Sequence, residues 1–356
     1  MSFKFSNYLP TKIIFSDDSI NKLSKIINNN KVLLISTQGN LDRGIYEKLN
    51  LKNFQIVEQI LNISSHPEIQ LAEDLYKKVS SKKFDMILAV GGGSVIDIAK
   101  VLSVSFANKK TEISHLIKNP SLITDYSITP VLAIPTTSGT GSEVTPYATL
   151  WDSKKTKKYS LSLIDLHPAY AIFIPELTLT LSKEITIQTG LDALSHSLES
   201  IWNKNANPIS LRFSIQAAKL ILDSLSVLIN RENTIDLRSK MQLASLFAGL
   251  AISNTQTAIS HAVSYYITTK YNISHGIACS FLIPDLIDKA IGKYDFIDEA
   301  FIEIFGELSS KKIRRLYKEI EAPSSFSDLN ITDSEITEIK NYIRNNPRAL
   351  NTLVHL

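Results

Sequence analysis

The chain has 356 residues, of which 44% are hydrophobic and 21% are charged, and its 38 basic side chains nearly balance 35 acidic ones. This length exceeds the size at which one hydrophobic core stops growing, so it predicts two domains in an ordinary globular protein. The balanced charge argues against nucleic acid or a membrane surface as a partner.

The cysteine and hydropathy patterns indicate the compartment. The single cysteine, Cys279, excludes an internal disulfide bond and is typical of a reducing environment. The first residues lack the apolar core of a signal peptide, and no apolar run reaches the roughly 18 residues that span a bilayer. We therefore expect a cytoplasmic protein.

Short apolar runs alternate with segments of helical periodicity in the first half of the chain. Strands are expected at residues 31–36, 54–57, 84–90 and 130–134, and helices at residues 68–80 and 94–106. Continuously apolar strands that alternate with helices predict a mainly parallel sheet covered on both faces. Such sheets bind ligands at the carboxyl ends of their strands.

Helical periodicity dominates the second half. Helices are expected at residues 185–203, 210–230, 234–252, 258–270 and 275–291. The chain is therefore predicted to comprise an α/β nucleotide-binding domain, residues 1–170, and an all-helical metal-binding domain, residues 171–356.

A glycine triplet, Gly91-Gly92-Gly93, is followed by Ser94 and joins a predicted strand to a predicted helix. Glycines let a phosphate approach the backbone, and a helix N-terminus supplies free N–H groups. The pattern departs from the dinucleotide fingerprint because Ile96 occupies the place of its third glycine. By itself, the triplet is as consistent with a plain tight turn as with a phosphate-binding loop.

A second loop, Pro135–Glu143, also follows a predicted strand and is rich in glycines and hydroxyl side chains. Two such loops after neighbouring strands fit a pyrophosphate that bridges both, so they predict nucleotide binding. Asp97 and Lys100 lie on the helix after the first loop, where an exposed charge pair is an alternative interpretation.

Asp192 and His196 are spaced four residues apart in a segment with helical periodicity. On a helix, this spacing points a carboxylate and an imidazole from one face, about one turn apart. Each group alone is equally consistent with a buried hydrogen-bonded side chain. Their combination with two further histidines predicts a metal site.

Those histidines, His261 and His275, would lie about 21 Å apart on one unbroken helix. That distance is too long for ligands at about 2 Å from a shared cation, so a break is expected at residues 271–274. One Asp and three His suit Fe²⁺, Zn²⁺, Mn²⁺ or Co²⁺. Cys279 is either a fifth ligand or, as we favour, a small buried side chain.

Together these segments resemble the iron-containing (group III) alcohol dehydrogenase family, whose fold is similar to that of dehydroquinate synthase. The motifs that carry the resemblance occur in the same order as in the family: residues 10–15, 91–100, 135–145, 175–178, 189–196, and His261 with His275-Gly276. The resemblance implies that Asp192, His196, His261 and His275 bind the metal ion and are catalytic. It implies cofactor contacts from Thr37, Gly91, Gly92, Gly93, Ser94, Asp97, Thr136, Thr137, Thr140 and Lys158.

Within the family, residues 198–208 and 260–265 resemble the phosphonoacetaldehyde reductase branch. This resemblance implies a small aldehyde that carries an anion, with a sulfonate as a close alternative to a phosphonate. The expected substrate contacts are Asn203, Lys204, Asn205 and Tyr265. A lysine at a helix end, such as Lys204, is equally typical of a solvated position.

The sequence departs from the family in several places. Tyr265 stands where many members have a second histidine, Ile174 where an Asp is common, and His66 where an Asn is usual. Residues 37–40 offer no carboxylate to bind ribose hydroxyls, and Arg43 follows closely. We therefore expect NADP, with NAD as the alternative.

The sequence thus predicts a metal-dependent oxidoreductase that reduces a small aldehyde with NAD(P)H. Fe²⁺ is the expected metal ion and Zn²⁺ the alternative, and the resemblance implies a homodimer. Competing interpretations are a general short-chain alcohol or polyol dehydrogenase, a lyase of the dehydroquinate synthase type, and a nucleotide-binding module with a structural metal ion.

Overall fold

The computed structural model describes residues 5–152 and 157–356. The described chain forms two compact units. The α/β unit comprises described residues within 9–137 and 142–180, and the helical unit comprises residues 5–8, 138–141 and 181–356. The units divide ten residues later than the predicted boundary. A cut at residue 170 would remove a strand from the sheet, because Tyr170–Phe173 pairs within it.

The α/β unit contains a six-stranded sheet in the order β1-β8-β5-β4-β2-β3, with every neighbouring pair parallel, and a separate antiparallel hairpin, β6-β7. Its strands are β1 (Lys12–Phe15), β2 (Lys31–Ile35), β3 (Gln55–Ile60), β4 (Met86–Gly91), β5 (Val131–Pro135), β6 (Tyr147–Asp152), β7 (Lys157–Ser162) and β8 (Tyr170–Phe173). Its helices are α1 (Ser19–Ile27), α2 (Gln38–Asp42), α3 (Ile45–Lys48), α4 (Ile69–Val79), α5 (Gly93–Ala107) and α6 (Ile113–Lys118).

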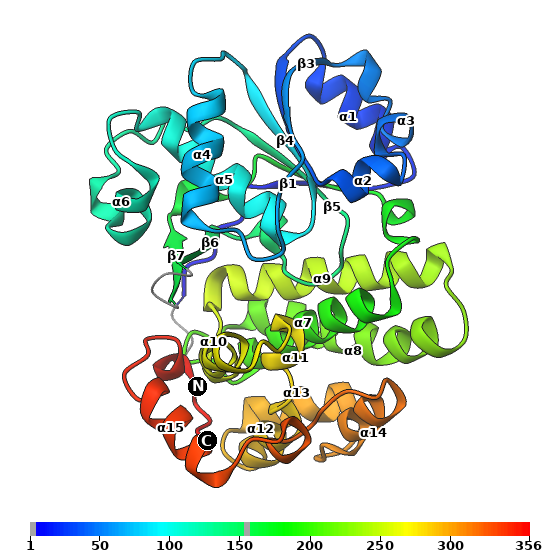
Figure 1. The fold of residues 1–356 in the computed structure, drawn as a ribbon. Coiled ribbons are helices and arrows are strands. Elements are labelled where there is room, and N and C mark those ends of the chain that lie inside the picture. The colour runs from blue at the N-terminus through cyan, green and yellow to red at the C-terminus, as the bar shows by residue number, and fades with distance from the viewer. Residues whose placement is uncertain (1–4, 153–156) are drawn as a thin grey trace. The chain divides into compact units, whose positions relative to one another are not determined.

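Both faces of this sheet are buried, as continuously apolar strands require. Side chains alternate along each strand, so Leu33 and Ile87 pack with residues of α4, α5 and α6, whereas Leu34 and Leu88 pack with residues of α1. Figure 1 shows α4 and α5 on one side of the sheet and α1 on the other. The predicted parallel sheet with helices on both faces is confirmed.

The helical unit contains α7 (Lys183–Ile201), α8 (Pro208–Asn230), α9 (Ile235–Thr255), α10 (Ile259–Tyr271), α11 (His275–Ala278), α12 (Ile283–Ala290), α13 (Asp295–Phe305), α14 (Lys311–Glu319) and α15 (Asp333–Ile343). Side chains that precede the three longest helices cap them: Ser182, Asn207 and Thr234 accept hydrogen bonds from backbone N–H groups of the first turns. The predicted all-helical second half is confirmed.

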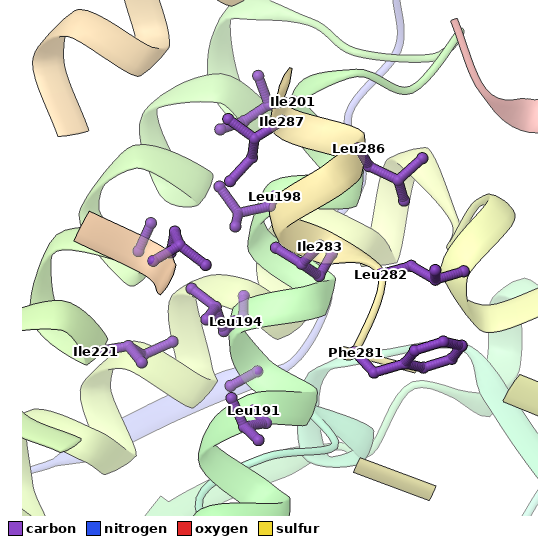
Figure 2. Packing of buried hydrophobic residues seen from close by; sticks show 14 of the residues in the cluster. Leu191, Leu194, Leu198, Ile201, Ile221, Phe281, Leu282, Ile283, Leu286 and Ile287 are labelled. Atoms are coloured by element: carbon purple, nitrogen blue, oxygen red, sulfur yellow. The ribbon is translucent and has the colours of Figure 1, made fainter. Parts of the chain in front are cut away.

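One apolar stripe of α7 fixes how that helix is oriented in the helical core. Figure 2 shows Leu191, Leu194, Leu198 and Ile201 of α7 packed near Ile283, Leu286 and Ile287 of α12. These α7 positions recur every three or four residues, which is the period of one helix face. A neighbouring face of α7 is therefore left for polar side chains.

The predicted helix over residues 275–291 is wrong, because two helices, α11 and α12, occupy that segment. Pro284 lies in the first turn of α12, where its missing N–H group has no cost, but it cannot continue a helix that started at His275. The break predicted at residues 271–274 is confirmed, and Asn272 ends α10 in the left-handed conformation with φ 53°.

Among the described residues, one helix, α8, passes the length and hydropathy test for a membrane span. The same helix carries Arg212, Lys219 and Asp223, and its residues Ile215, Ile221 and others belong to the buried core of the helical unit. A core helix accounts for this result.

Candidate functional site

Helix α7 presents Asp192, His196 and Glu199 on one face, since their spacing of four and three residues follows the helical period. All three side chains are buried. The helix lies close to its neighbours because Gly190 has no side chain; a Cβ atom there would lie 2.9 Å from Leu225. Tight packing therefore holds the polar face of α7 in a fixed position.

Helices α10 and α11 bring two more imidazoles to this face. His261 lies in the first turn of α10, and His275 is the first residue of α11. Gly276 lets α11 pass against α7, because a Cβ atom at this position would lie only 1.9 Å from the Gln188 carbonyl oxygen. The glycine after His275 therefore has a steric role in placing that histidine.

The four predicted metal ligands converge on one oxygen atom. The Nε2 atoms of His196, His261 and His275 lie 3.6, 3.4 and 3.9 Å from Asp192 Oδ1. Two ligand atoms that each lie about 2.1 Å from one tetrahedral cation are separated by about 3.4 Å. The separations of His196 and His261 from Asp192 are close to this value and that of His275 is longer, so each imidazole can share a cation with the carboxylate.

The opposite ring nitrogens are held by the protein. The Nδ1 atom of His196 lies 3.3 Å from the Gly139 carbonyl oxygen, that of His261 lies 2.6 Å from Glu199 Oε2, and that of His275 lies 3.5 Å from Ser264 Oγ. Within the described part of the chain, His261 Nε2 is buried without a hydrogen-bond partner. A buried nitrogen of this kind is expected where a cation binds, so the residues fit a metal ion.

Two of the ligands, Asp192 and His196, have titration properties that agree with this fit. Burial lowers the pKa of His196 to about 4, so its imidazole is neutral and keeps a lone pair at neutral pH. Burial acts to raise the pKa of Asp192, but the surrounding imidazoles outweigh it and hold that pKa well below its usual range. Asp192 is therefore an ionised carboxylate ligand. For His261, burial acts to lower the pKa, but the neighbouring acidic groups outweigh it and hold that pKa well above its usual value.

Cys279 is buried beside the cluster. Its Sγ lies 3.4 Å from Asp192 Oδ1, and its sulfur and the ligand atoms of Asp192, His261 and His275 all lie within 4.8 Å of one another. Burial, together with the nearby carboxylate, raises the pKa of the thiol to about 12. The thiol thus stays protonated and donates a hydrogen bond to Asp192, which agrees with the small buried side chain favoured from sequence.

The two predicted phosphate loops adjoin within the α/β unit. Gly92 caps α5, and the backbone N–H of Thr136 donates to the Gly91 carbonyl oxygen at 3.0 Å. A Cβ atom on Gly92 would lie 3.2 Å from Thr137 Oγ1, and one on Gly91 would lie 2.5 Å from Val95. Both glycines are therefore required for this close approach, and the free N–H groups of α5 lie beside it.

Other predicted cofactor contacts have structural partners. Thr37 caps α2 by accepting from the Asn40 backbone N–H at 3.2 Å. Asp97 is partly buried and accepts hydrogen bonds from Ser142 Oγ at 2.5 Å and from the Thr149 backbone N–H at 2.9 Å. These bonds join α5 to the end of the second loop and to β6.

Two further predicted cofactor contacts lie elsewhere. Lys158, on β7, places its ammonium group 5.4 Å from the centre of the Trp151 ring. Thr140 belongs to the segment 138–141, which forms part of the helical unit. In that segment a Cβ atom on Gly141 would lie 2.5 Å from Gly249 Cα of α9.

The predicted substrate contacts are only partly brought together. The side-chain amides of Asn203 and Asn205 donate to the carbonyl oxygens of Gln256 and Thr255, so both fasten the end of α7. Lys204 is exposed, with its backbone N–H bonded to the Asn351 carbonyl oxygen.

Tyr265 lies nearest to the metal ligands among the predicted substrate contacts. Its ring stacks on that of His275, with the ring centroids 6.5 Å apart. The guanidinium of Arg348 lies 5.8 Å from the centre of the Tyr265 ring. No pattern in the sequence connects Arg348 with the site.

Glu199 is a site residue that sequence reasoning missed. Its buried carboxylate accepts the Nδ1 hydrogen bond of His261. A signal was present, since Glu199 follows Asp192 by seven residues and His196 by three, which places it on the same helix face.

Comparison with known proteins agrees with this arrangement. The family model "Iron-containing alcohol dehydrogenase" matches residues 10–175, and "Fe-containing alcohol dehydrogenase family, C-terminal" matches residues 186–352. The NAD-dependent methanol dehydrogenase of Bacillus methanolicus is 31% identical over 278 residues, which cover 74% of this chain and 71% of that protein. The chain therefore belongs to the iron-containing alcohol dehydrogenase family.

Two other similarities bear on function. The aldehyde-alcohol dehydrogenase of Streptococcus pneumoniae serotype 4 is 32% identical over 293 residues, 78% of this chain but 33% of that protein, so the chain spans about a third of the length of such relatives. The structure of sulfoacetaldehyde reductase from Bifidobacterium kashiwanohense, solved in complex with NAD⁺, has a TM-score of 0.92 at 25% identity and covers 99% of this chain and 96% of that one. The predicted dehydroquinate synthase-like fold is thus confirmed as that of iron-containing alcohol dehydrogenases.

Proposed function

We propose that the protein reduces small anionic aldehydes to alcohols with NAD(P)H, using one Fe²⁺ ion bound by Asp192, His196, His261 and His275. The observation that carries this proposal is the convergence of three Nε2 atoms on Asp192 Oδ1. When bound, the metal ion would supply Lewis acidity toward a carbonyl oxygen, and the nicotinamide would supply the hydride.

The protein's own groups hold and orient these partners. The imidazoles and Asp192 provide N and O ligands, which suit Fe²⁺ and, as an alternative, Zn²⁺. The N–H groups at the start of α5, with Gly91 and Gly92, provide a phosphate-binding turn. Binding and orientation of this kind are what a protein contributes to cofactor chemistry.

The anionic substrate class is supported by a row of three groups. The His275 side chain is 28% exposed, whereas those of the other ligands are at most 6% exposed, so substrate approaches the site beside His275. Tyr265 stacks on that imidazole, and the Arg348 guanidinium covers Tyr265. A guanidinium matches the oxygens of a sulfonate or phosphonate. The similarity to a sulfoacetaldehyde reductase supports the same class.

The cofactor that we propose is NADP(H), with NAD(H) as an alternative. Arg43 reaches back to α2, where its Nη2 donates to Asn40 Oδ1 at 2.6 Å. A cation at this place favours a 2′-phosphate, and residues 37–40 contain no carboxylate that would repel it. The Arg43→Ala variant should lose affinity for NADPH but not for NADH, as measured by the fluorescence of the bound reduced cofactor.

We also propose a homodimer. Strand β1 is an edge of the parallel sheet, and Ile13 on this strand is 40% exposed. An edge strand with an exposed apolar side chain is a common site of self-association. Light scattering on the purified full chain measures the oligomeric state directly.

A substrate panel tests the proposed reaction. Purified protein loaded with Fe²⁺ is mixed with NADPH and with sulfoacetaldehyde, phosphonoacetaldehyde or propanal, and the loss of reduced-cofactor absorbance is followed. We expect kcat/KM to be at least about tenfold higher for the anionic aldehydes, as a charged group recognised by Arg predicts. Equal values would contradict the anionic class, and no net consumption of NADPH would favour a lyase.

Two matched variants test the anion contact. Arg348→Met should remove the preference for anionic aldehydes and leave the rate with propanal unchanged. Lys204→Met removes an exposed cation at the end of α7 and should preserve the preference. If Lys204→Met instead removed the preference for anionic aldehydes and Arg348→Met preserved it, the anion would be bound by Lys204.

A further inference from the structure

The carboxylate of Glu199 is fully buried and receives four N–H groups from one short stretch of chain. The donors are the backbone N–H groups of Ala258 at 3.1 Å, Ser260 at 2.5 Å and His261 at 3.4 Å, and the ring Nδ1 of His261 at 2.6 Å. All of them lie at the start of α10, which has no cap from a side chain of its own.

The backbone contacts mean that Glu199 caps a neighbouring helix. The first N–H groups of a helix have no partner within the helix, and here a carboxylate from α7 accepts them. This arrangement fixes the start of α10, and therefore the Cα position of His261, relative to α7. Because Asp192 and His196 are also on α7, Glu199 sets the distance between ligands from different helices.

The ring contact fixes the proton of His261. Glu199 has only acceptor oxygens toward its four donors, so Nδ1 carries a hydrogen and Nε2 is the nitrogen that is left to face a cation. The contacts of the other two rings are longer, at 3.3 Å to the Gly139 carbonyl oxygen and 3.5 Å to Ser264 Oγ. The Nδ1 contact of His261, at 2.6 Å, is shorter than these two, and its partner is a carboxylate.

We propose that Glu199 is a positioning residue for the metal centre, which acts through His261 by fixing its tautomer and its place. The proposal rests on the proposed metal site but not on the identity of the substrate. Groups that orient a metal-bound histidine typically contribute 10–100-fold to metal affinity. We expect a contribution of this size from Glu199.

Metal affinity of the full-length chain is the direct test, with Zn²⁺ and Co²⁺ as probes and a chromophoric chelator as competitor. The Glu199→Gln variant keeps the shape but turns an NH₂ group toward N–H donors, so the dissociation constant should rise about 10–100-fold. Ser200→Ala is the matched control, because this neighbour is equally buried and loses only its hydrogen bond with Thr255 at 3.1 Å. Equal affinity of Glu199→Gln and wild type, or an equal loss in Ser200→Ala, would overturn the proposal.

Double variants separate positioning from a general structural role. In a His261→Ala background, Glu199→Gln should have no further effect on Co²⁺ affinity, because the residue through which it acts is gone. In a His275→Ala background the full 10–100-fold effect should remain. An equal effect in both backgrounds would show that Glu199 only supports the fold.

A spectrum of the wild-type protein keeps the proposal testable if the Glu199 variants do not fold. Long-range ¹H–¹⁵N correlation spectra of histidine-labelled, metal-free protein report the tautomer of each ring. We expect His261, assigned by comparison with His261→Ala, to carry its hydrogen on Nδ1. A ring without a hydrogen on Nδ1 would refute the proposal. None of these measurements uses an aldehyde, so a failure of the proposed reaction would be seen separately.

Discussion

The two units each enclose charged side chains, but in opposite ways. In the α/β unit, the fully buried Lys100 ammonium donates to Ser142 Oγ at 3.0 Å and to the carbonyl oxygens of Thr145 and Tyr147, both at 2.8 Å. All three of its hydrogens are thus matched inside the protein. We call Lys100 and these three acceptors the closed cluster, because no hydrogen of the ammonium group is left for a ligand.

In the helical unit, four polar side chains form what we call the open cluster, which comprises Asp192, His196, His261 and His275. Three Nε2 atoms face Asp192, and that of His261 is buried without a hydrogen-bond partner among the described residues. Buried charge by itself therefore does not indicate a ligand site. What distinguishes the metal site is that three imidazole Nε2 atoms lie 3.4–3.9 Å from one carboxylate oxygen.

The largest effect is expected from breaking the open cluster. His261→Ala should lower turnover at least about 10³-fold, because a catalytic metal site with one ligand fewer holds its ion weakly. Fluorescence of bound NADPH should be unchanged, since Gly91, Gly92 and Thr136 of the phosphate loops lie in the α/β unit. Turnover above a tenth of the wild-type value would contradict the proposed metal site.

Breaking the closed cluster should affect stability instead. Lys100→Met leaves the Ser142 hydroxyl and the carbonyl oxygens of Thr145 and Tyr147 without their donor. Each buried acceptor that loses its partner costs about 1–3 kcal/mol of unfolding free energy. Urea denaturation in a Trp202→Phe background follows the α/β unit alone, because Trp151 is then the only tryptophan. Metal affinity should stay within about twofold of the wild-type value; a larger change would show that the two clusters are coupled.

Separating α11 from α7 should have a smaller effect. Gly276→Ala places a methyl group against the Gln188 carbonyl oxygen, and overpacking of this kind costs about 1–3 kcal/mol. Because His275 moves with α11, we expect metal affinity to fall at least about tenfold.

Gly292→Ala is the control for this substitution. A Cβ atom on Gly292 meets nothing within 4 Å, although φ is +75° there, so the variant loses about 1 kcal/mol through backbone strain alone. Its metal affinity should be unchanged. A normal metal affinity in Gly276→Ala would remove the steric role that we assign to Gly276.

The last prediction concerns the pH dependence of stability at Glu143, whose charge acts on Lys100. Burial raises the pKa of Glu143 from 4.5 to about 7. Between these values the folded state holds a proton that the unfolded state releases, so stability falls as pH rises through this interval and the loss is complete above about pH 7. Glu143→Gln does not titrate, so its stability relative to wild type should grow with pH by at most about 1.4 kcal/mol per pH unit. Parallel curves for the two proteins would exclude this titration.

The sequence was sufficient for the features that depend on local spacing. Apolar runs predicted β2, β4 and β5, and the interval between Asp192 and His196 predicted their common helix face. The sequence was not sufficient where contacts between segments that are far apart on the chain determine the environment of a residue. Lys100 was open to interpretation as an exposed residue, but it is fully buried, because its acceptors follow more than forty residues later on the chain.

Two features that were not predicted, the contact of Glu199 with α10 and the start of α12, had some indication in the sequence. The spacing of Glu199 from His196 predicts a shared face, yet a single acidic residue in an apolar helix does not reveal that its partners lie on α10. Pro284 marked the start of α12, but the apolar periodicity around it continues, so residues 275–291 were predicted as one helix. The role of Gly276 depends on a backbone contact that no local pattern contains.

Residues 138–141 are synthesised early but contact parts of the metal centre that are synthesised later. The Gly139 carbonyl contacts His196, and Gly141 lies against Gly249, although strands of the other unit flank the segment on the chain. A ribosome releases these residues well before α9, so the helical unit completes its folding only after a stretch made much earlier has been recruited. A gene fragment that begins after residue 180 would encode the four ligands but lack the group that orients one of them.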